Sequence, residues 1–178
     1  MICRSKNHKL VQIIIDLPTL MKEIIQHSLA LTGLRILVVD DDEDTRFYVN
    51  TVLTADGATV TTVDSAATAL ALLPELQPDV CICDIAMPGE DGYSLIRKIR
   101  ALPQDQGGEV LALAFTAYAD REDRILALEA GFNIHLGKPV APEDLVMTIA
   151  NLVNFGNDIT DTSSIGVSRY LERQLRSH

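Results

Sequence analysis

Five short, continuously apolar runs alternate with longer segments of mixed polarity from residue 34 onward. The runs span residues 34–39, 58–63, 80–83, 110–115 and 134–137. Runs this short and this apolar are typical of strands that are buried on both faces, as in a parallel sheet. The second run is rich in threonine and less apolar than the others, which indicates a strand at the edge of the sheet.

The segments between the runs have the spacing of amphipathic helices. Three of them place apolar residues on one helical face: Val49, Val52 and Leu53; Leu95, Ile99 and Leu102; and Leu145, Ile149 and Leu152. Helix-boundary residues stand where these segments begin or end: Asp56-Gly57, Ser65, Asp120 and Pro142. Five strand–helix units in alternation predict an α/β fold with a doubly wound parallel sheet and helices on both faces.

Polar residues that can carry chemistry follow four of the five predicted strands. Asp40 and Asp41 follow the first strand, Asp84 the third, Thr116 the fourth and Lys138 the fifth. Ligands of doubly wound sheets bind beyond the carboxyl ends of the strands, at the point where the strand order reverses. With the strand order 2-1-3-4-5 this reversal lies between the first and third strands, so the three carboxylates are expected to converge there.

Three carboxylates held together repel one another unless a cation lies among them. Such oxygen ligands suit Mg²⁺, which also takes ligands from phosphate. One carboxylate can then attack phosphorus and form an acyl phosphate, while Lys138 and the Thr116 hydroxyl offset charge on the phosphoryl oxygens. Singly, these residues have simpler explanations, such as an acidic helix start at residues 40–44 or a turn at Asp84. Their joint placement at the ends of four strands favours the explanation that they form one site for phosphoryl transfer.

Four segments resemble response-regulator receiver domains. They are residues 36–42 (ILVVDDD), 84–92 (DIAMPGEDG), 115–117 (FTA) and 137–139 (GKP). The resemblance covers residues 34–153 and implies a flavodoxin-like (βα)5 fold with the strand order 2-1-3-4-5. It implies a phosphoacceptor of a two-component or phosphorelay system, which catalyses only its own phosphorylation and dephosphorylation. Residues 135–139 (HLGKP) look like receivers attached to hybrid histidine kinases.

The same resemblance implies roles for the residues of the acidic site. Asp84 is the phosphoacceptor. Asp41 and Asp84 bind Mg²⁺ directly, Asp40 assists through water, and the Ala86 backbone carbonyl is the remaining protein ligand. Ala86 and Tyr118 flank the acyl phosphate, and because a methyl group cannot position an attacking water, we expect slow self-dephosphorylation.

The remaining roles lie on the fourth and fifth strands. By the resemblance, Lys138 and Thr116 contact the phosphoryl group, Ala117 leaves room for it, and the bond before Pro139 is cis. His135 departs from the commoner pattern, which has Tyr or Phe at this position as the residue that turns inward on phosphorylation. Either His135 fills the space that Thr116 leaves, or it is a half-buried strand histidine without a switching role.

Composition limits which partners, membrane segments and disulfide bonds the chain can have. The net charge of −10 disfavours a nucleic-acid partner, and no apolar run is long enough to span a membrane. Cys3, Cys81 and Cys83 form no disulfide framework, so we expect Cys81 and Cys83 to be core residues of a cytoplasmic protein.

Residues 1–33 are predicted as an N-terminal extension, which either contains one helix after Pro18 or is a linker. Residues 154–178 are predicted as a polar C-terminal tail.

The expected partners are a histidine kinase or histidine phosphotransfer protein and a downstream protein. By the resemblance, the output face comprises the helix at residues 121–130, the fifth strand and the last helix, and a homodimer through this face is a further option.

Two other functions remain as alternatives to a phosphoacceptor. One is an interaction module that is not phosphorylated. Another is an aspartyl-phosphate hydrolase, but that class has Thr or Val two residues after Asp-x-Asp, and Asp44 stands there after Asp40 and Asp42.

Overall fold

Five strands and five longer helices alternate along the part of the chain that the structure describes. The computed structural model describes residues 30–117 and 120–156. The strands are β1 (Arg35–Val39), β2 (Thr59–Val63), β3 (Val80–Cys83), β4 (Leu111–Thr116) and β5 (Ile134–Gly137). The helices are α2 (Glu43–Ala55), α3 (Ala66–Leu76), α4 (Gly92–Arg100), α5 (Arg121–Ala130) and α6 (Pro142–Gly156), with a 3-10 turn at Gln104–Gln106.

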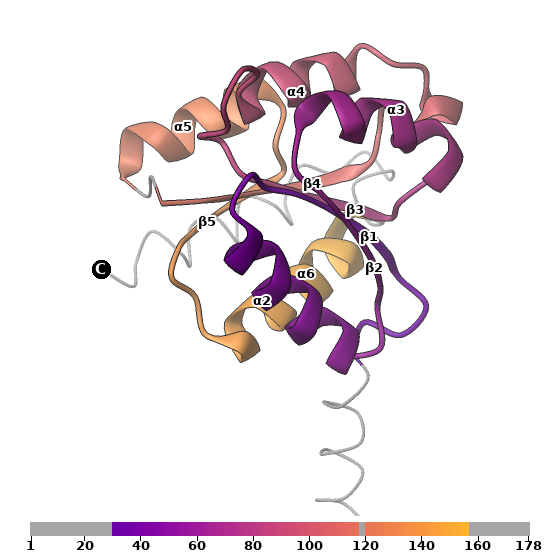
Figure 1. Cartoon of the computed structure of the whole chain (residues 1–178), viewed down its shortest axis with the longest axis vertical. Helices are drawn as coiled ribbons and strands as arrows, with labels where there is room; N and C mark the ends of the chain where they lie inside the picture. Colours follow the sequence, from indigo (N-terminus) through magenta and orange to yellow (C-terminus); the bar gives the residue numbers. More distant parts are fainter. Residues whose placement is uncertain (1–29, 118–119, 157–178) are drawn as a thin grey trace, which may run out of the picture.

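The strands form one parallel sheet of order β2-β1-β3-β4-β5, which confirms the predicted fold class and strand order. Helices α3, α4 and α5 cover one face of the sheet, and α2 and α6 cover the other (Figure 1). The threonine-rich β2 is an edge strand, as predicted. Three predicted strands were wrong by one residue: β1 begins at Arg35 and β2 at Thr59, one residue late in each case, and β4 is shifted to Leu111–Thr116.

The shift of β4 matters because it places Thr116 inside the strand. Thr116 pairs with Gly137 of β5, and its carbonyl accepts a hydrogen bond from the Lys138 amide at 2.8 Å. The ladder between the two strands therefore continues one residue beyond the apolar run. Apolar runs locate buried side chains, and the buried Thr116 is polar.

Side-chain caps begin the helices next to the carboxyl ends of the strands. The carboxylates of Asp42, Asp91 and Asp120 accept hydrogen bonds from backbone amides in the first turns of α2, α4 and α5, at 2.7–2.9 Å. These hydrogen bonds satisfy amides that have no partner within the helix. The predicted caps at Ser65 and Asp120 are confirmed, and Asp56 ends α2.

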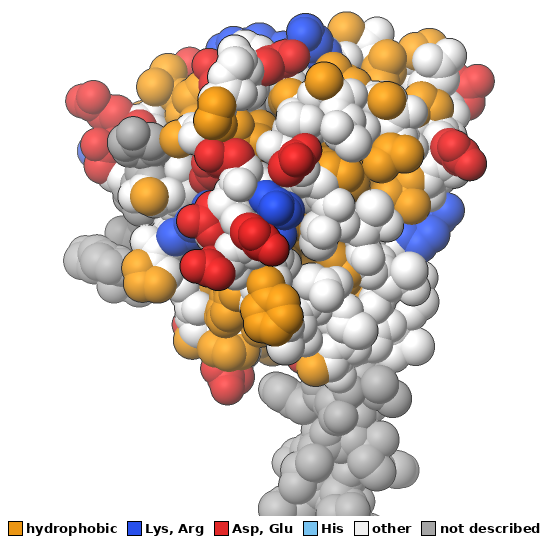
Figure 2. All heavy atoms as spheres, in the orientation of Figure 1, with side chains coloured by type: hydrophobic (Ala, Val, Ile, Leu, Met, Phe, Trp, Pro, Cys, Tyr) orange, Lys and Arg blue, Asp and Glu red, His pale blue; other side chains and the backbone are white. Residues whose placement is uncertain are grey.

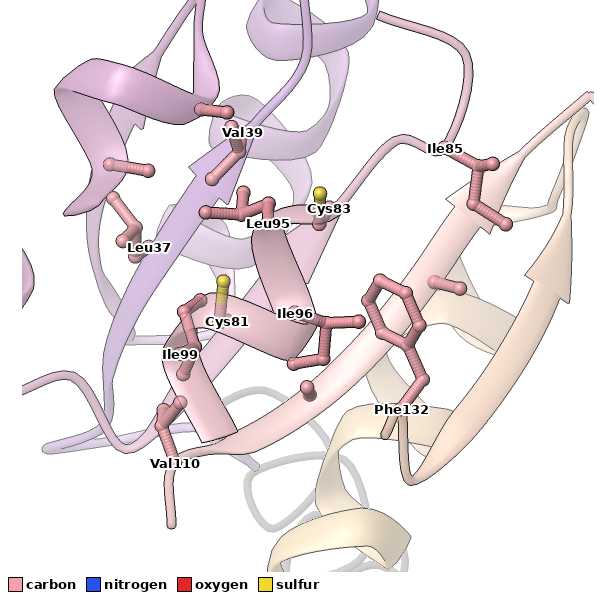
Figure 3. Packing of buried hydrophobic residues seen from close by; sticks show 14 of the residues in the cluster. Leu37, Val39, Cys81, Cys83, Ile85, Leu95, Ile96, Ile99, Val110 and Phe132 are labelled. Atoms are coloured by element: carbon pink, nitrogen blue, oxygen red, sulfur yellow. The ribbon is translucent and has the colours of Figure 1, made fainter. Parts of the chain in front are cut away.

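Two apolar cores lie on opposite faces of the sheet because successive strand residues point to alternate faces. One core, under α3, α4 and α5, includes Leu37 and Val39 of β1 together with Leu95 and Ile99 of α4 (Figure 3). The other, under α2 and α6, includes Ile36 and Val38 with the buried residues of those helices. Burial on both faces fixes the strands and hence the positions of the residues at their ends.

Cys81 and Cys83 point into the core beneath α4, as Figure 3 shows. Both are buried, which confirms their predicted place. Burial raises the pKa of the Cys81 thiol to about 12 and that of Cys83 well above its ordinary value. Both thiols are therefore protonated at neutral pH.

The packed unit reaches slightly beyond residues 34–153. Leu31 is fully buried in the core beneath α2 and α6, and its amide donates to the Asp56 carbonyl at 3.1 Å. Helix α6 continues to Gly156. The helix expected after Pro18 lies outside the described residues, as does most of the predicted tail. None of the helices in the described ranges has the length and apolar character needed to cross a membrane.

Candidate functional site

The carboxyl ends of β1 and β3 bring three aspartates together. The two strands are neighbours, with Val39 opposite Cys83, so the residues that follow them meet. One carboxylate oxygen from each of Asp40, Asp41 and Asp84 lies within 4.8 Å of the others. Figure 2 shows acidic side chains gathered on this face, with basic groups and an apolar patch beside them.

The three carboxylates differ in burial and in their partners. Asp40 and Asp84 are buried, at 1% and 6% exposure, whereas Asp41 faces solvent. Asp40 Oδ1 accepts a hydrogen bond from the Asp42 amide at 3.0 Å, and Asp84 Oδ2 accepts one from the Ala86 amide at 2.9 Å. Burial raises the pKa of Asp40, against the hydrogen bond from Lys138.

Lys138, directly after β5, reaches two of these aspartates. Its Nζ lies 2.6 Å from Asp40 Oδ2 and 3.2 Å from Asp84 Oδ1, and 5.2 Å from the centre of the Phe115 ring. Burial alone would lower the pKa of Lys138, but the hydrogen bond and charge of Asp40, followed by those of Asp84, raise it overall. The ammonium is therefore charged at neutral pH. The bond between Lys138 and Pro139 is cis.

The donor set fits a hard divalent cation. The cluster has three carboxylates, and the one ammonium group beside it pairs with only two of them, so negative charge is in excess. A cation among these oxygens would reduce the repulsion between the carboxylates. Carboxylate oxygens without sulfur or imidazole donors suit Mg²⁺ better than a transition metal.

Thr116 and His135 lie on the same face of the sheet, toward α5. Thr116 is fully buried and follows Ala114 by two residues, and Ala114 pairs with His135 of β5. His135 is half-buried. The pKa of Asp120, at the start of α5, is lowered chiefly by the hydrogen bond from the Asp123 amide and least by its electrostatic interaction with His135. Ala117 is exposed and Tyr118 lies outside the described residues.

The loop after β3 shapes the other side of the site. Ala86 is exposed beside Asp84. Gly92 begins α4 so close to the strand end that a Cβ there would lie 2.3 Å from the Asp84 carbonyl oxygen. The Gly92 amide also donates to the Ile85 carbonyl at 2.9 Å. Glycine at this position therefore lets α4 pack directly against the backbone of Asp84.

Sequence reasoning missed two residues of α2, of which one contacts a site residue and the other contacts the segment that carries Lys138. Arg46 Nη1 donates to the backbone carbonyl of Asp40 at 2.7 Å. The Tyr48 hydroxyl donates to the backbone carbonyl of Val140, two residues after Lys138, at 2.7 Å. The Arg46 contact spans six residues and the Tyr48 contact spans 92. Both acceptors are backbone carbonyls, which every residue has, so the residue types along the chain do not reveal either contact.

Comparison with known proteins decides the family. The sequence profile of the response regulator receiver domain matches residues 36–150. The chain belongs to this family. The receiver domain has an acidic pocket with Lys138 beside it, and the family is not one of conventional enzymes.

Similar proteins occur in different contexts. An uncharacterized 14.6 kDa protein of Leptolyngbya boryana is 47% identical over 120 residues, which are 67% of this chain and 89% of that protein. The transcriptional regulatory protein GltR of Pseudomonas aeruginosa is 35% identical over 125 residues, covering 70% of this chain but only 51% of GltR.

A solved relative contains a metal ion. The receiver domain of a sensor histidine kinase from Pseudomonas aeruginosa, 31% identical, covers 69% of this chain and 99% of its own with a TM-score of 0.63. It has a magnesium ion coordinated in its active site cleft. Because a transcriptional regulator and a kinase receiver are both similar, the resemblance to hybrid-kinase receivers stays a prediction.

Proposed function

We propose that this receiver domain accepts a phosphoryl group on Asp84 from a histidine kinase or a histidine phosphotransfer protein. The observation that supports this most is the setting of the Asp84 carboxylate. It is almost fully buried, lies among two further carboxylates and has the Lys138 ammonium 3.2 Å away. A nucleophile for phosphoryl transfer needs such positioning and compensating positive charge.

Asp84 would act as the nucleophile through one carboxylate oxygen. As an O–P bond forms to that oxygen, the P–N bond of the donor's phosphohistidine breaks, and its electron pair returns to the imidazole nitrogen. The Ala86 amide holds the other oxygen and orients the carboxylate. Lys138 offsets charge on the phosphoryl oxygens, and the Thr116 hydroxyl donates a hydrogen bond to them once phosphorylation brings it near.

Asp41 and Asp84 would hold Mg²⁺ directly, with Asp40 assisting through water and the Ala86 carbonyl as a further ligand. When bound, Mg²⁺ supplies the positive charge that offsets repulsion between the carboxylates and the incoming phosphoryl group. Lys138 alone cannot do this, because it already pairs with Asp40 at 2.6 Å.

The test is phosphorylation of the full chain by labelled acetyl phosphate. We expect stable label in the presence of Mg²⁺ and none after the divalent cation is removed with EDTA. A chain that stays unlabelled with Mg²⁺, both with acetyl phosphate and with a panel of histidine kinases, would favour the alternative, an interaction module that is not phosphorylated.

The phosphoryl group on Asp84 is expected to be long-lived because Ala86 offers only a methyl group beside it. We predict that Ala86→Asn speeds self-dephosphorylation about tenfold or more, since a carboxamide can orient an attacking water. The measurement is the decay of label after acetyl phosphate is removed. Ala101→Asn, at an exposed position after α4, is the matched control and should leave the decay unchanged. Equal decay rates in the two variants would contradict this account.

Output is proposed to follow a movement of Thr116 toward the phosphoryl group, with His135 filling the space that it leaves. In this account the size of the side chain at position 135 matters, so His135→Phe should keep the response. The response is read as the change in backbone amide NMR signals of α5 and β5 on phosphorylation. Loss of this change with an intact phosphorylation rate would show instead that the imidazole itself is required.

Helix α5, strand β5 and helix α6 are proposed as the output face. Ile125 and Leu126 of α5 and Met147 of α6 expose about half of their surface, at 47%, 50% and 47%. A downstream protein or a second copy of the chain would cover them. Sedimentation of the phosphorylated and unphosphorylated chain distinguishes a homodimer from a monomer that awaits its target. A cytoplasmic location stays a prediction.

A further inference from the structure

The segment that carries Lys138 is tied to the rest of the fold at two points. On one side, the Lys138 amide donates to the Thr116 carbonyl of β4 at 2.8 Å. On the other side, the Val140 carbonyl accepts the hydroxyl of Tyr48 from α2 at 2.7 Å. The side chains of Tyr48 and Val140 also pack against the same core, beneath α2 and α6. The position of Lys138 is therefore determined by β4 and by α2 together.

A displacement at Val140 would pass to Lys138 because only Pro139 separates them. The proline ring restricts φ, and proline has no amide hydrogen with which to form a hydrogen bond of its own. Pro139 is exposed, so packing does not hold it in place. The nearest fixed point after Lys138 is therefore the carbonyl that Tyr48 holds.

The position of the Lys138 ammonium is sensitive to small shifts. Its Nζ contacts Asp40 at 2.6 Å and Asp84 at 3.2 Å, and the Asp84 contact is already near the upper limit of a hydrogen bond. A shift of about 1 Å at a group that stabilises a transition state can cost up to two orders of magnitude in rate.

We propose that Tyr48 is a positioning residue for phosphoryl transfer, whose hydroxyl holds the segment after β5 so that Lys138 stays on the carboxylates of Asp40 and Asp84. The proposal rests on the function proposed for Asp84. Helix α2 would then take part in the reaction indirectly, because its Tyr48 holds in place the lysine that follows β5.

The test compares Tyr48→Phe, which removes the hydroxyl and keeps the ring, with Tyr93→Phe. Tyr93 is a half-buried tyrosine of α4 that packs against the core on the opposite face of the sheet. Two quantities are measured on the full chain with Mg²⁺: the rate of labelling by acetyl phosphate, and the hydrogen exchange of the Lys138 ammonium by ¹⁵N NMR. The ammonium signal is assigned by its absence in Lys138→Met.

We expect Tyr48→Phe to slow labelling by roughly tenfold and to speed exchange of the Lys138 ammonium, while Tyr93→Phe changes neither. A loss of fold stability alone would speed exchange of protected backbone amides throughout the sheet as well. Faster exchange that is confined to the Lys138 ammonium therefore separates positioning from stability. Unchanged exchange in Tyr48→Phe, or labelling as fast as in Tyr93→Phe, would overturn the proposal. An unlabelled wild type would refute the proposed function of Asp84 as well, so the two failures are distinguishable.

Discussion

Asp84→Asn is expected to abolish labelling by acetyl phosphate while the fold remains intact. Asparagine has nearly the same shape, and its carbonyl oxygen can still accept the hydrogen bond from the Ala86 amide. It lacks the charged oxygen that attacks phosphorus, and a neutral amide is a poor nucleophile. The change also removes one of three neighbouring negative charges, so thermal stability should stay equal or rise.

The matched control for this variant lies at the other end of the same strand. Asp79 directly precedes β3, and its carboxylate accepts a hydrogen bond from the Arg35 amide at 2.7 Å, far from the acidic cluster. Asp79→Asn should keep the full extent of labelling. Label retained in Asp84→Asn at the wild-type level would place the phosphoacceptor at another residue.

Lys138→Met is expected to slow labelling by about 10²–10³-fold, the usual effect of removing one group that stabilises charge in a transition state. Methionine has a similar length and can pack along the same path, but it brings no charge. The Asp40 carboxylate would also lose its 2.6 Å partner within the fold, and breaking such a pair destabilises a protein by up to about 3 kcal/mol. The measurements are the initial rate of labelling and the midpoint of thermal unfolding.

Lys98→Met provides the control for the loss of a lysine. Lys98 Nζ lies 2.7 Å from Glu90 Oε1, but its side chain is 57% exposed. Exposed ion pairs contribute little to stability, and Lys98 does not reach the acidic cluster. Its replacement should change neither labelling nor unfolding. A Lys138→Met variant that labels as fast as Lys98→Met would show that the ammonium has no part in the transfer.

The fold could be predicted because the apolar runs are short and buried on both faces. In β1 and β3 nearly every side chain is buried, and the pattern is unmistakable even in a single sequence. The site followed from the same runs, since Asp40 and Asp84 come directly after them. The end of β4 was wrong by one residue because Thr116 is polar and yet paired within the sheet.

The contacts of α2 could not be predicted in the same way. Tyr48 and Val140 are 92 positions apart and meet only when the sheet is assembled. The acceptor is a backbone carbonyl, which every residue has, so the identity of residue 140 carries no signal. The acidic residues after β1 also differ in burial and role, which the composition of the segment cannot show. Asp40 is buried, whereas Asp42 caps a helix at the surface.

Because Cys81 and Cys83 are buried beneath α4, the rate at which their thiols react reports how often α4 separates from the sheet. The thiolate is the species that reacts with alkylating reagents, and while the native packing holds, both side chains stay protonated and out of the reagent's reach. Alkylation of these two residues therefore measures transient opening of this half of the molecule. Comparing its rate with and without phosphorylation would show whether the acyl phosphate stabilises or weakens the packing of α4 on the strands, without a cysteine having to be engineered into the chain.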